Sequence, residues 1–323
     1  MAPPCLRRLA IKLFLPSLGV ALALAATVML ATPARAQITF PSASPISAGN
    51  IAVRVQPLVS EGTEGAQSVT GEGVIIYGAS PNLALISEND LVVSNLADVT
   101  VGGKTERLAA TGLGDSLEEA RYTIYQLDGI GSTFRIAPLV GVSVPTGMDN
   151  VNAAMPRYDQ PGSGGWGGKA ALTSSWQTLD WDAAAEVGYE THSTAAGYQV
   201  GNKLEANAGF YYPLWPKIIE SPFEKQLFLS LETNYISDTY DRLYGHFMPG
   251  TGGQLWLIDP GLMYTGALSS INFTFLLPMM QTTNGPASRY DFGFELELRW
   301  SFFYQSSLVG PSKNLKAERR GYV

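Results

Sequence analysis

The sequence of 323 residues contains one cysteine and two histidines, and only 15% of its residues are charged. A single cysteine excludes a disulfide-stapled fold, and so few cysteines and histidines exclude a conventional zinc site. Beyond residue 36, no run reaches the roughly 18 to 20 uninterrupted apolar residues that a membrane-spanning helix needs. Hydrophobic residues nevertheless make up 46% of the chain, and the mean hydropathy is +0.06. The apolar residues are therefore distributed along the chain in a pattern other than long runs.

The first 36 residues have the features of an export signal. Three basic residues, Arg7, Arg8 and Lys12, precede an apolar stretch over 13–30, and small residues end the segment at 34–36. This order is typical of a secretory signal peptide, and we predict cleavage after Ala36. An uncleaved N-terminal anchor is the alternative.

The predicted mature chain is acidic. Removing the four basic residues of the signal leaves 17 basic and 28 acidic residues, a net charge of −11. Nucleic acid is not expected as a partner, because binding to phosphates needs clustered Lys and Arg. The basic cluster that does occur, at 313–320, belongs to a segment over 306–323 that we interpret as a flexible charged tail.

From residue 49 onward, apolar residues recur at every second position, as in an extended strand with one apolar face. The alternation is clearest over 289–304, which is longer than a typical strand of about 5 to 6 residues and suits a strand tilted across a bilayer. The following residues form its apolar face: Tyr290, Phe292, Phe294, Leu296, Leu298, Trp300, Phe302 and Tyr304.

Twelve such segments can be placed along the chain. They lie at about 51–60, 69–79, 82–93, 115–127, 133–144, 165–178, 180–191, 201–213, 224–236, 253–265, 268–279 and 289–304. Their connections alternate between longer and shorter ones, with a 10-residue connection after 213 as the exception. This alternation matches the long outer loops and short periplasmic turns of an outer-membrane barrel with an even number of strands. We therefore predict an all-β fold, an antiparallel transmembrane β-barrel of about 12 strands, over 37–305.

A soluble β-sandwich is the alternative architecture, since its strands also alternate. In a lipid-facing sheet every edge must be closed, because unpaired backbone groups cost several kcal/mol each in hydrocarbon. The sparse charge opposite rows of Phe, Tyr, Trp and Leu favours the barrel. Tyr and Trp near predicted strand ends are typical of the aromatic girdles of such barrels.

If the apolar side chains face lipid, the polar side chains between them line the lumen. The candidates are Arg135, Lys169, Asp182, Glu186, Glu190, Lys203, Glu205, Glu232, Asn234, Glu295, Glu297 and Arg299. Such groups either pair with one another and fill the interior, or leave a wet path whose charge selects solutes. The excess of acidic residues in the later strands predicts a preference for cations or uncharged solutes over anions.

Catalysis is not expected. His192 and His246 fall in predicted outer loops, and neither is followed by a motif that would supply a nucleophile within reach. The glycine-rich stretch at 162–169 lacks the glycine and the Ser or Thr that a phosphate-binding loop requires around Lys169. The sequence thus predicts no cofactor and no metal. A membrane hydrolase would need a serine close to one of the histidines.

The chain resembles a family of outer-membrane proteins assigned to transport or to the meta-pathway of phenol degradation. The resemblance covers roughly 70–305 and is carried by the stretches at 111–115, 120–122, 136–147, 162–166 and 187–189. It implies an exported β-barrel that passes small organic, often aromatic, compounds across the outer membrane of a Gram-negative bacterium. The chain differs from the family pattern at Glu118 and Glu119, and about 19 residues follow Tyr304.

We therefore predict a passive channel for small organic solutes, with the lipid bilayer as its surroundings. A barrel with a closed lumen, whose outer loops at 94–114, 145–164 and 237–252 bind a partner or stabilise the envelope, is the alternative. Salt bridges of Glu295 or Glu297 with Arg135 or Arg299 would close such a lumen. The oligomeric state and the identity of the solute do not follow from the sequence.

Overall fold

The computed structural model describes residues 43, 46–62, 66–101, 104–216, 225–266, 269–284 and 290–303. The predicted signal peptide and tail lie outside these residues. The described chain is built from strands and one 3-10 turn, η2 (Arg157–Asp159). Within the described ranges, no helix combines the length and hydropathy needed to cross a bilayer.

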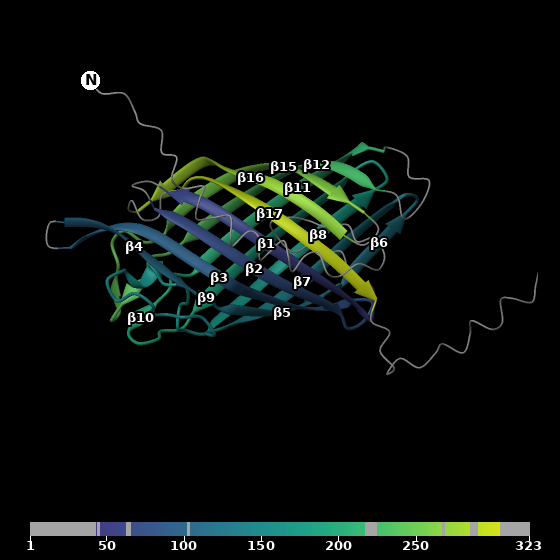
Figure 1. Ribbon diagram of the computed structural model, residues 1–323. Coiled ribbons are helices and arrows are strands. Elements are labelled where there is room, and N and C mark those ends of the chain that lie inside the picture. Colours follow the sequence, from purple (N-terminus) through teal and green to yellow (C-terminus); the bar gives the residue numbers. More distant parts are fainter. Residues whose placement is uncertain are drawn as a thin grey trace, which may run out of the picture.

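One large antiparallel sheet contains most of the strands (Figure 1). They are β1 (Asn50–Gly62), β2 (Gln67–Gly78), β3 (Leu83–Val101), β4 (Lys104–Gly112), β5 (Ser116–Tyr122), β6 (Tyr125–Gly129), β7 (Ser132–Val144), β8 (Gly167–Thr178), β9 (Asp182–His192), β11 (Lys203–Trp215), β12 (Gln226–Asp238), β15 (Gly253–Thr265), β16 (Ser269–Thr283) and β17 (Tyr290–Phe303).

The sheet closes on itself. Strand β1 pairs with both β2 and β17, β2 pairs with β3, and the remaining strands link β3 to β17 around the ring. Strands β4 and β5 pair with successive parts of β3, while β5 and β6 pair with successive parts of β7. These three short strands together therefore fill one strand position of the barrel, between β3 and β7. The result is a closed barrel of twelve antiparallel positions. The predicted barrel is confirmed, and the sandwich alternative is wrong.

The predicted segments agree with the observed strands except near the fourth position. The range 94–114, predicted as an outer loop, instead forms most of a long hairpin in which β3 continues to Val101 and pairs with β4. The segment predicted over 115–127 is divided into β5 and β6 by a break at 123–124. In Figure 1 the β3–β4 hairpin projects beyond the barrel at one end and β6 projects at the other.

The two ends of the barrel differ in the length of their connections. Short turns such as 79–82 and 179–181 lie at one end, and the long connections 145–166, 193–202 and 239–252 lie at the other. We call these the turn end and the loop end; in barrels of this kind they face the periplasm and the outside. At the loop end a second small sheet joins the last two loops through β10 (Tyr198–Gln199), β13 (Arg242–Leu243) and β14 (His246–Phe247).

Exposure alternates along the strands as the sequence pattern predicts. On β12, Leu229 and Leu231 are 46% and 51% exposed, whereas Ser230 and Glu232, which alternate with them, are fully buried. On β7, Val140 and Val142 are exposed, while Leu139 is buried. Apolar side chains therefore form the outer surface, where lipid satisfies them, and the side chains between them point into the barrel.

Candidate functional site

The candidate site is the inner face of the barrel. All twelve candidate residues from the sequence lie at positions that alternate with the outward apolar row. They come from β7 (Arg135), β8 (Lys169), β9 (Asp182, Glu186 and Glu190), β11 (Lys203 and Glu205), β12 (Glu232 and Asn234) and β17 (Glu295, Glu297 and Arg299). A role in solute contact remains a proposal for each of them.

A buried ion pair joins β5 to β8 across β7. The Nζ of Lys169 lies 3.0 Å from Oε1 of Glu119, and the Glu119 side chain is fully buried. Gly141 of β7 pairs with both residues in register, so no side chain stands between them. A Cβ at Gly141 would lie 3.0 Å from Cγ of Glu119, which means that the glycine makes room for the pair.

A second charged group connects the strands at the closure of the barrel. The Nη2 of Arg54 on β1 lies 3.8 Å from Glu72 on β2 and 3.7 Å from Glu88 on β3. Nearby on β1, the amide of Gln56 donates a hydrogen bond of 2.6 Å to Oε1 of Glu295 on β17. Arg54, Glu72, Glu88 and Glu119 were not among the sequence candidates, although their positions follow the same alternation.

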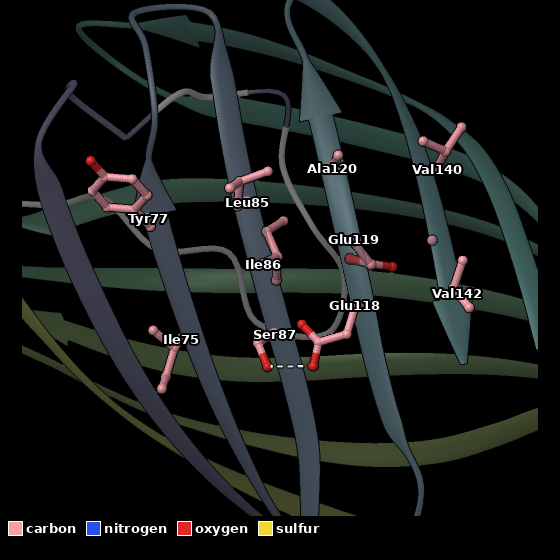
Figure 2. Close-up of a pocket in the computed structure, with 11 residues that line it drawn as sticks. Ile75, Tyr77, Leu85, Ile86, Ser87, Glu118, Glu119, Ala120, Val140 and Val142 are labelled. Carbon is pink, nitrogen blue, oxygen red and sulfur yellow. Dashed lines mark hydrogen bonds between the residues drawn. The ribbon is translucent and has the colours of Figure 1, made fainter. Parts of the chain in front are cut away.

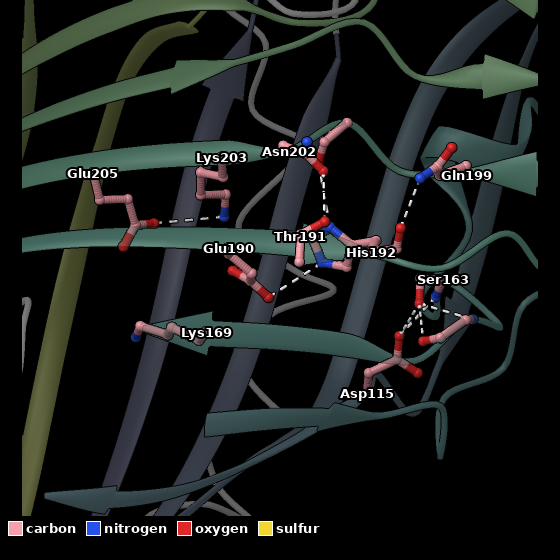
Figure 3. A network of polar contacts seen from close by, with 12 residues as sticks. Asp115, Ser163, Lys169, Glu190, Thr191, His192, Gln199, Asn202, Lys203 and Glu205 are labelled. Carbon is pink, nitrogen blue, oxygen red and sulfur yellow. Dashed lines mark hydrogen bonds and ion pairs between the residues drawn. The ribbon is translucent and has the colours of Figure 1, made fainter. Parts of the chain in front are cut away.

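Near the loop end, opposite charges lie side by side on neighbouring strands (Figure 3). Glu190 of β9 pairs in register with Lys169 on one side and Lys203 on the other. Its Oε1 lies 3.1 Å from Nε2 of His192, and Nζ of Lys203 lies 3.6 Å from Glu205. His192 thus ends β9 with its ring nitrogens beside Glu190 and the carbonyl of Gly201.

The closed-lumen alternative would pair Arg135 with Glu295 or Glu297, but the structure gives Arg135 other partners. Arg135 instead donates to Gln126 of β6 at 3.3 Å and to Gln177 of β8 at 2.8 Å. Both glutamines are on strands paired with β7, close to the turn end, so the guanidinium finds acceptors on its own side of the barrel.

Two inward apolar clusters were missed by sequence reasoning. Val74, Ile86 and Leu139 pack together on one wall, and Tyr211, Phe228 and Met263 pack together on another. The tyrosine hydroxyl of the second cluster donates to Glu232. These residues occupy inward positions, which were expected to be polar. They could have been located as apolar residues at inward positions, such as Phe228, which lies between the outward Leu227 and Leu229 of β12. The interior is therefore amphipathic, with apolar patches beside charged groups.

A pocket of about 510 Å³ lies on the outer wall over β2, β3, β5 and β7 (Figure 2). Apolar residues such as Ile75, Leu85 and Val142 line it. Glu118, which departs from the family pattern, points outward here and accepts a hydrogen bond of 2.9 Å from Ser87. Its lining also includes Ile86 and Glu119, whose side chains belong to the inner face.

The loops at the loop end are held by two carboxylates, the partly buried Asp115 and the buried Asp241. Asp115 accepts from the backbone N–H of Gly147 at 2.9 Å, from the N–H of Ser163 at 2.8 Å and from the Ser163 hydroxyl at 2.6 Å (Figure 3). Asp241 accepts from the hydroxyl of Tyr198 at 2.7 Å and from the N–H of Gly201 at 2.8 Å. Two carboxylates thus fix the long connections over the mouth of the barrel.

The loop 145–166 should respond to pH through Asp159. Burial raises the pKa of this carboxyl from 3.8 to about 6. Because the folded loop disfavours the charged form, its stability should be greatest at acidic pH and should fall as the pH rises from about 4 to about 6. Hydrogen exchange of the loop amides at pH 4.5 and pH 7 measures this difference, which Asp159→Asn should abolish. Equal pH dependence in wild type and variant would contradict the assignment.

Among the described residues, no group of three or more His, Cys, Asp or Glu is placed to hold a metal ion. The site therefore consists of hydrogen-bonding, charged and apolar side chains.

A family model described as "Putative MetA-pathway of phenol degradation" matches residues 58–277. The chain belongs to this family. No curated protein matches it. Among solved structures, an outer membrane channel from Pseudomonas putida F1 is similar at a TM-score of 0.59, with 13% identity over 82% of this chain and 100% of that chain. At this identity the likeness concerns the fold, which is that of outer-membrane barrels of Gram-negative bacteria, as predicted.

Two further barrels resemble the chain less. LpxR from Salmonella typhimurium has a TM-score of 0.42, with 8% identity over 78% of this chain and 99% of that chain. The β domain of the Bordetella autotransporter BrkA has a TM-score of 0.40, with 12% identity over 79% of this chain and 100% of that chain.

Proposed function

We propose that the protein is a passive, non-enzymatic channel for small organic solutes, aromatic ones among them. The observation that carries this proposal is the amphipathic inner face, where apolar clusters stand beside charged and hydrogen-bonding groups. An aromatic solute offers the complementary combination of an apolar ring and polar substituents. The name of the family and the similar channel from Pseudomonas putida F1 support the same function.

The charges of the inner face support a preference for cations and neutral solutes. Inward carboxylates outnumber inward basic groups in the described strands, and several of them lie on β9, β12 and β17. A negative potential inside a low-dielectric wall attracts cations and repels anions. We propose that the candidate residues named from the sequence act in this way.

A closed barrel with a structural or binding role is the second candidate. It is favoured by the complete burial of Glu232, Asp259 and Asn272 on neighbouring strands, because such packing leaves these groups no contact with bulk water. The loops held by Asp115 and Asp241 would then be the surface that meets a partner.

Single-channel recording in planar bilayers decides between the two candidates. We expect discrete conductance steps with K⁺ preferred over Cl⁻, and we expect Glu295→Gln or Glu232→Gln to lower the permeability ratio by about 2-fold or more. Glutamine keeps an oxygen acceptor for the bonds from Gln56 and Tyr211 while it removes the charge.

Glu106→Gln is the matched control, because Glu106 is exposed on β4, in the hairpin that projects from the barrel. This variant should keep the wild-type ratio. Folded, heat-modifiable protein that shows no conductance would exclude the channel and leave the closed barrel. Swelling of liposomes in phenol or benzoate solutions then tests the class of solute.

A further inference from the structure

Three neighbouring strands of the inner wall carry buried polar atoms that have no hydrogen-bond partner. Among these atoms are Oγ of Ser230 on β12, Oδ1 of Asp259 on β15 and Oγ1 of Thr274 on β16, and all three residues are fully buried. A buried polar atom without a partner costs about 1–3 kcal/mol, so such atoms in proteins usually contact an ordered water or ion. Three oxygens on adjacent strands therefore indicate a shared ligand.

The register of the strands brings these oxygens together around a glycine. Gly261 of β15 pairs with Ser230 on one side and with Thr274 on the other. A Cβ at Gly261 would lie 2.6 Å from the Ser230 hydroxyl oxygen and 2.8 Å from that of Thr274, so both hydroxyls lean over the space that the missing side chain leaves. Asp259 lies two residues along the same strand, on the same inward face.

The charge of this wall is negative. None of the residues of β12, β15 and β16 is a Lys or Arg, whereas Glu232 and Asp259 stand side by side in register. Glu295 of β17 pairs with Thr274 on the other side. The carboxyl groups of Glu232 and Glu295 accept bonds from Tyr211 and Gln56. Asp259 accepts a bond from the Asn234 amide through Oδ2, while its Oδ1 has no hydrogen-bond partner. A cation complements this arrangement better than a neutral molecule does.

We propose that Ser230, Asp259 and Thr274 bind a monovalent alkali cation above Gly261. Two hydroxyl oxygens and one carboxylate oxygen are hard ligands, which suit an alkali or alkaline-earth ion and not a transition metal. A divalent ion takes more carboxylate ligands than this set offers, and the described residues contain no group of three or more acidic or histidine side chains placed for one. The bound ion satisfies the three oxygens and offsets the charge of the wall. This proposal does not depend on whether the lumen conducts.

Crystals of the full-length protein grown in chloride-free potassium nitrate and soaked in thallous nitrate test the site directly. Tl⁺ replaces K⁺ and scatters anomalously, so a peak between the hydroxyls of Ser230 and Thr274 is expected. Density at that place without anomalous signal would mean water and would overturn the proposal.

A stability measurement tests the same site without crystals. The midpoint of heat modification on gels should be higher in KCl than in N-methyl-D-glucamine chloride of equal ionic strength, by about 3 °C or more, because a ligand stabilises the state that binds it. Thr274→Val and, separately, Ser230→Ala should remove this difference. The two variants provide independent readouts if one of them fails to fold.

Thr173→Val is the matched control. Thr173 is another fully buried inward threonine, but its hydroxyl donates to the carbonyl of Ala137 at 3.0 Å. It lies on β8, which is separated from β12 around the barrel by β11 and β9. This variant should have a lower midpoint in both salts and keep the difference between them. Equal midpoints for the wild type in both salts would overturn the proposal.

Discussion

Lys169→Met is expected to destabilise the barrel by about 3–5 kcal/mol, because it leaves Glu119 as an uncompensated charge in a buried position. Methionine is similar in length to lysine and keeps the packing of the aliphatic stem, so the loss reports the charge. In the wild type, Nζ of Lys169 lies 3.0 Å from Oε1 of Glu119, and both side chains are at most 10% exposed. Urea titration of the folded protein in lipid vesicles measures the change in the free energy of unfolding.

The double variant Glu119→Gln with Lys169→Met separates the pair from its surroundings. Removal of both charges should recover most of the stability, since a buried ion pair is often worth little more than a neutral pair of similar volume. Lys104→Met is the control, because Lys104 is exposed at the start of β4. If the double variant is as unstable as Lys169→Met alone, the loss comes from packing, and the ion pair is not its cause.

Asp115→Ala is expected to release the loop 145–166 from the mouth of the barrel. The substitution removes one carboxylate that accepts from two backbone N–H groups and one hydroxyl in Gly147 and Ser163. Hydrogen bonds to a charged group contribute about 1.5–3 kcal/mol each, so the loss of two or three should raise the rate of proteolysis within this loop by at least about 10-fold. Limited proteolysis of the folded protein, followed by mass spectrometry, measures the rate.

Asp180→Ala serves as the control for the loop, because Asp180 lies in the short turn between β8 and β9 at the opposite end of the barrel. The loop 145–166 should be cleaved in Asp180→Ala at the same rate as in the wild type. Cleavage of Asp115→Ala at the wild-type rate would show that other contacts, such as those of Gln160 with the backbone of 151–156, suffice to hold the loop.

The barrel could be predicted because lipid imposes a strict rule on the outer face. On β12, the outward Leu229 and Leu231 are apolar, whereas the inward Ser230 and Glu232 are polar. The same rule does not apply to the β3–β4 hairpin, which projects beyond the barrel. The hairpin instead contacts the loop 145–166, where Asn95 donates to the carbonyl of Asp159 and Asn152 donates to that of Ala109. No lipid-facing period selects apolar residues there, and the range 94–114 was wrongly predicted as a loop.

The inner face could be predicted only in part. The alternation identifies which side chains point inward, and it places Lys169, Glu190 and Lys203 on the same face. It does not identify their partners, because these depend on strand register and on residues that are distant in sequence. Glu119 reaches Lys169 because Gly141 stands between them, and Arg135 bonds to glutamines of neighbouring strands rather than to the glutamates of β17.

By itself, the sequence determined the fold class, the number of barrel positions and the orientation of most side chains, since these depend on local hydrophobic periodicity and on the need to close a sheet in lipid. Only the tertiary structure decided which charges pair, where apolar clusters such as Tyr211, Phe228 and Met263 interrupt the polar lining, and which buried oxygens are left without a donor. Those features arise from contacts between strands that are distant in sequence, and such contacts do not produce a periodic pattern of residues.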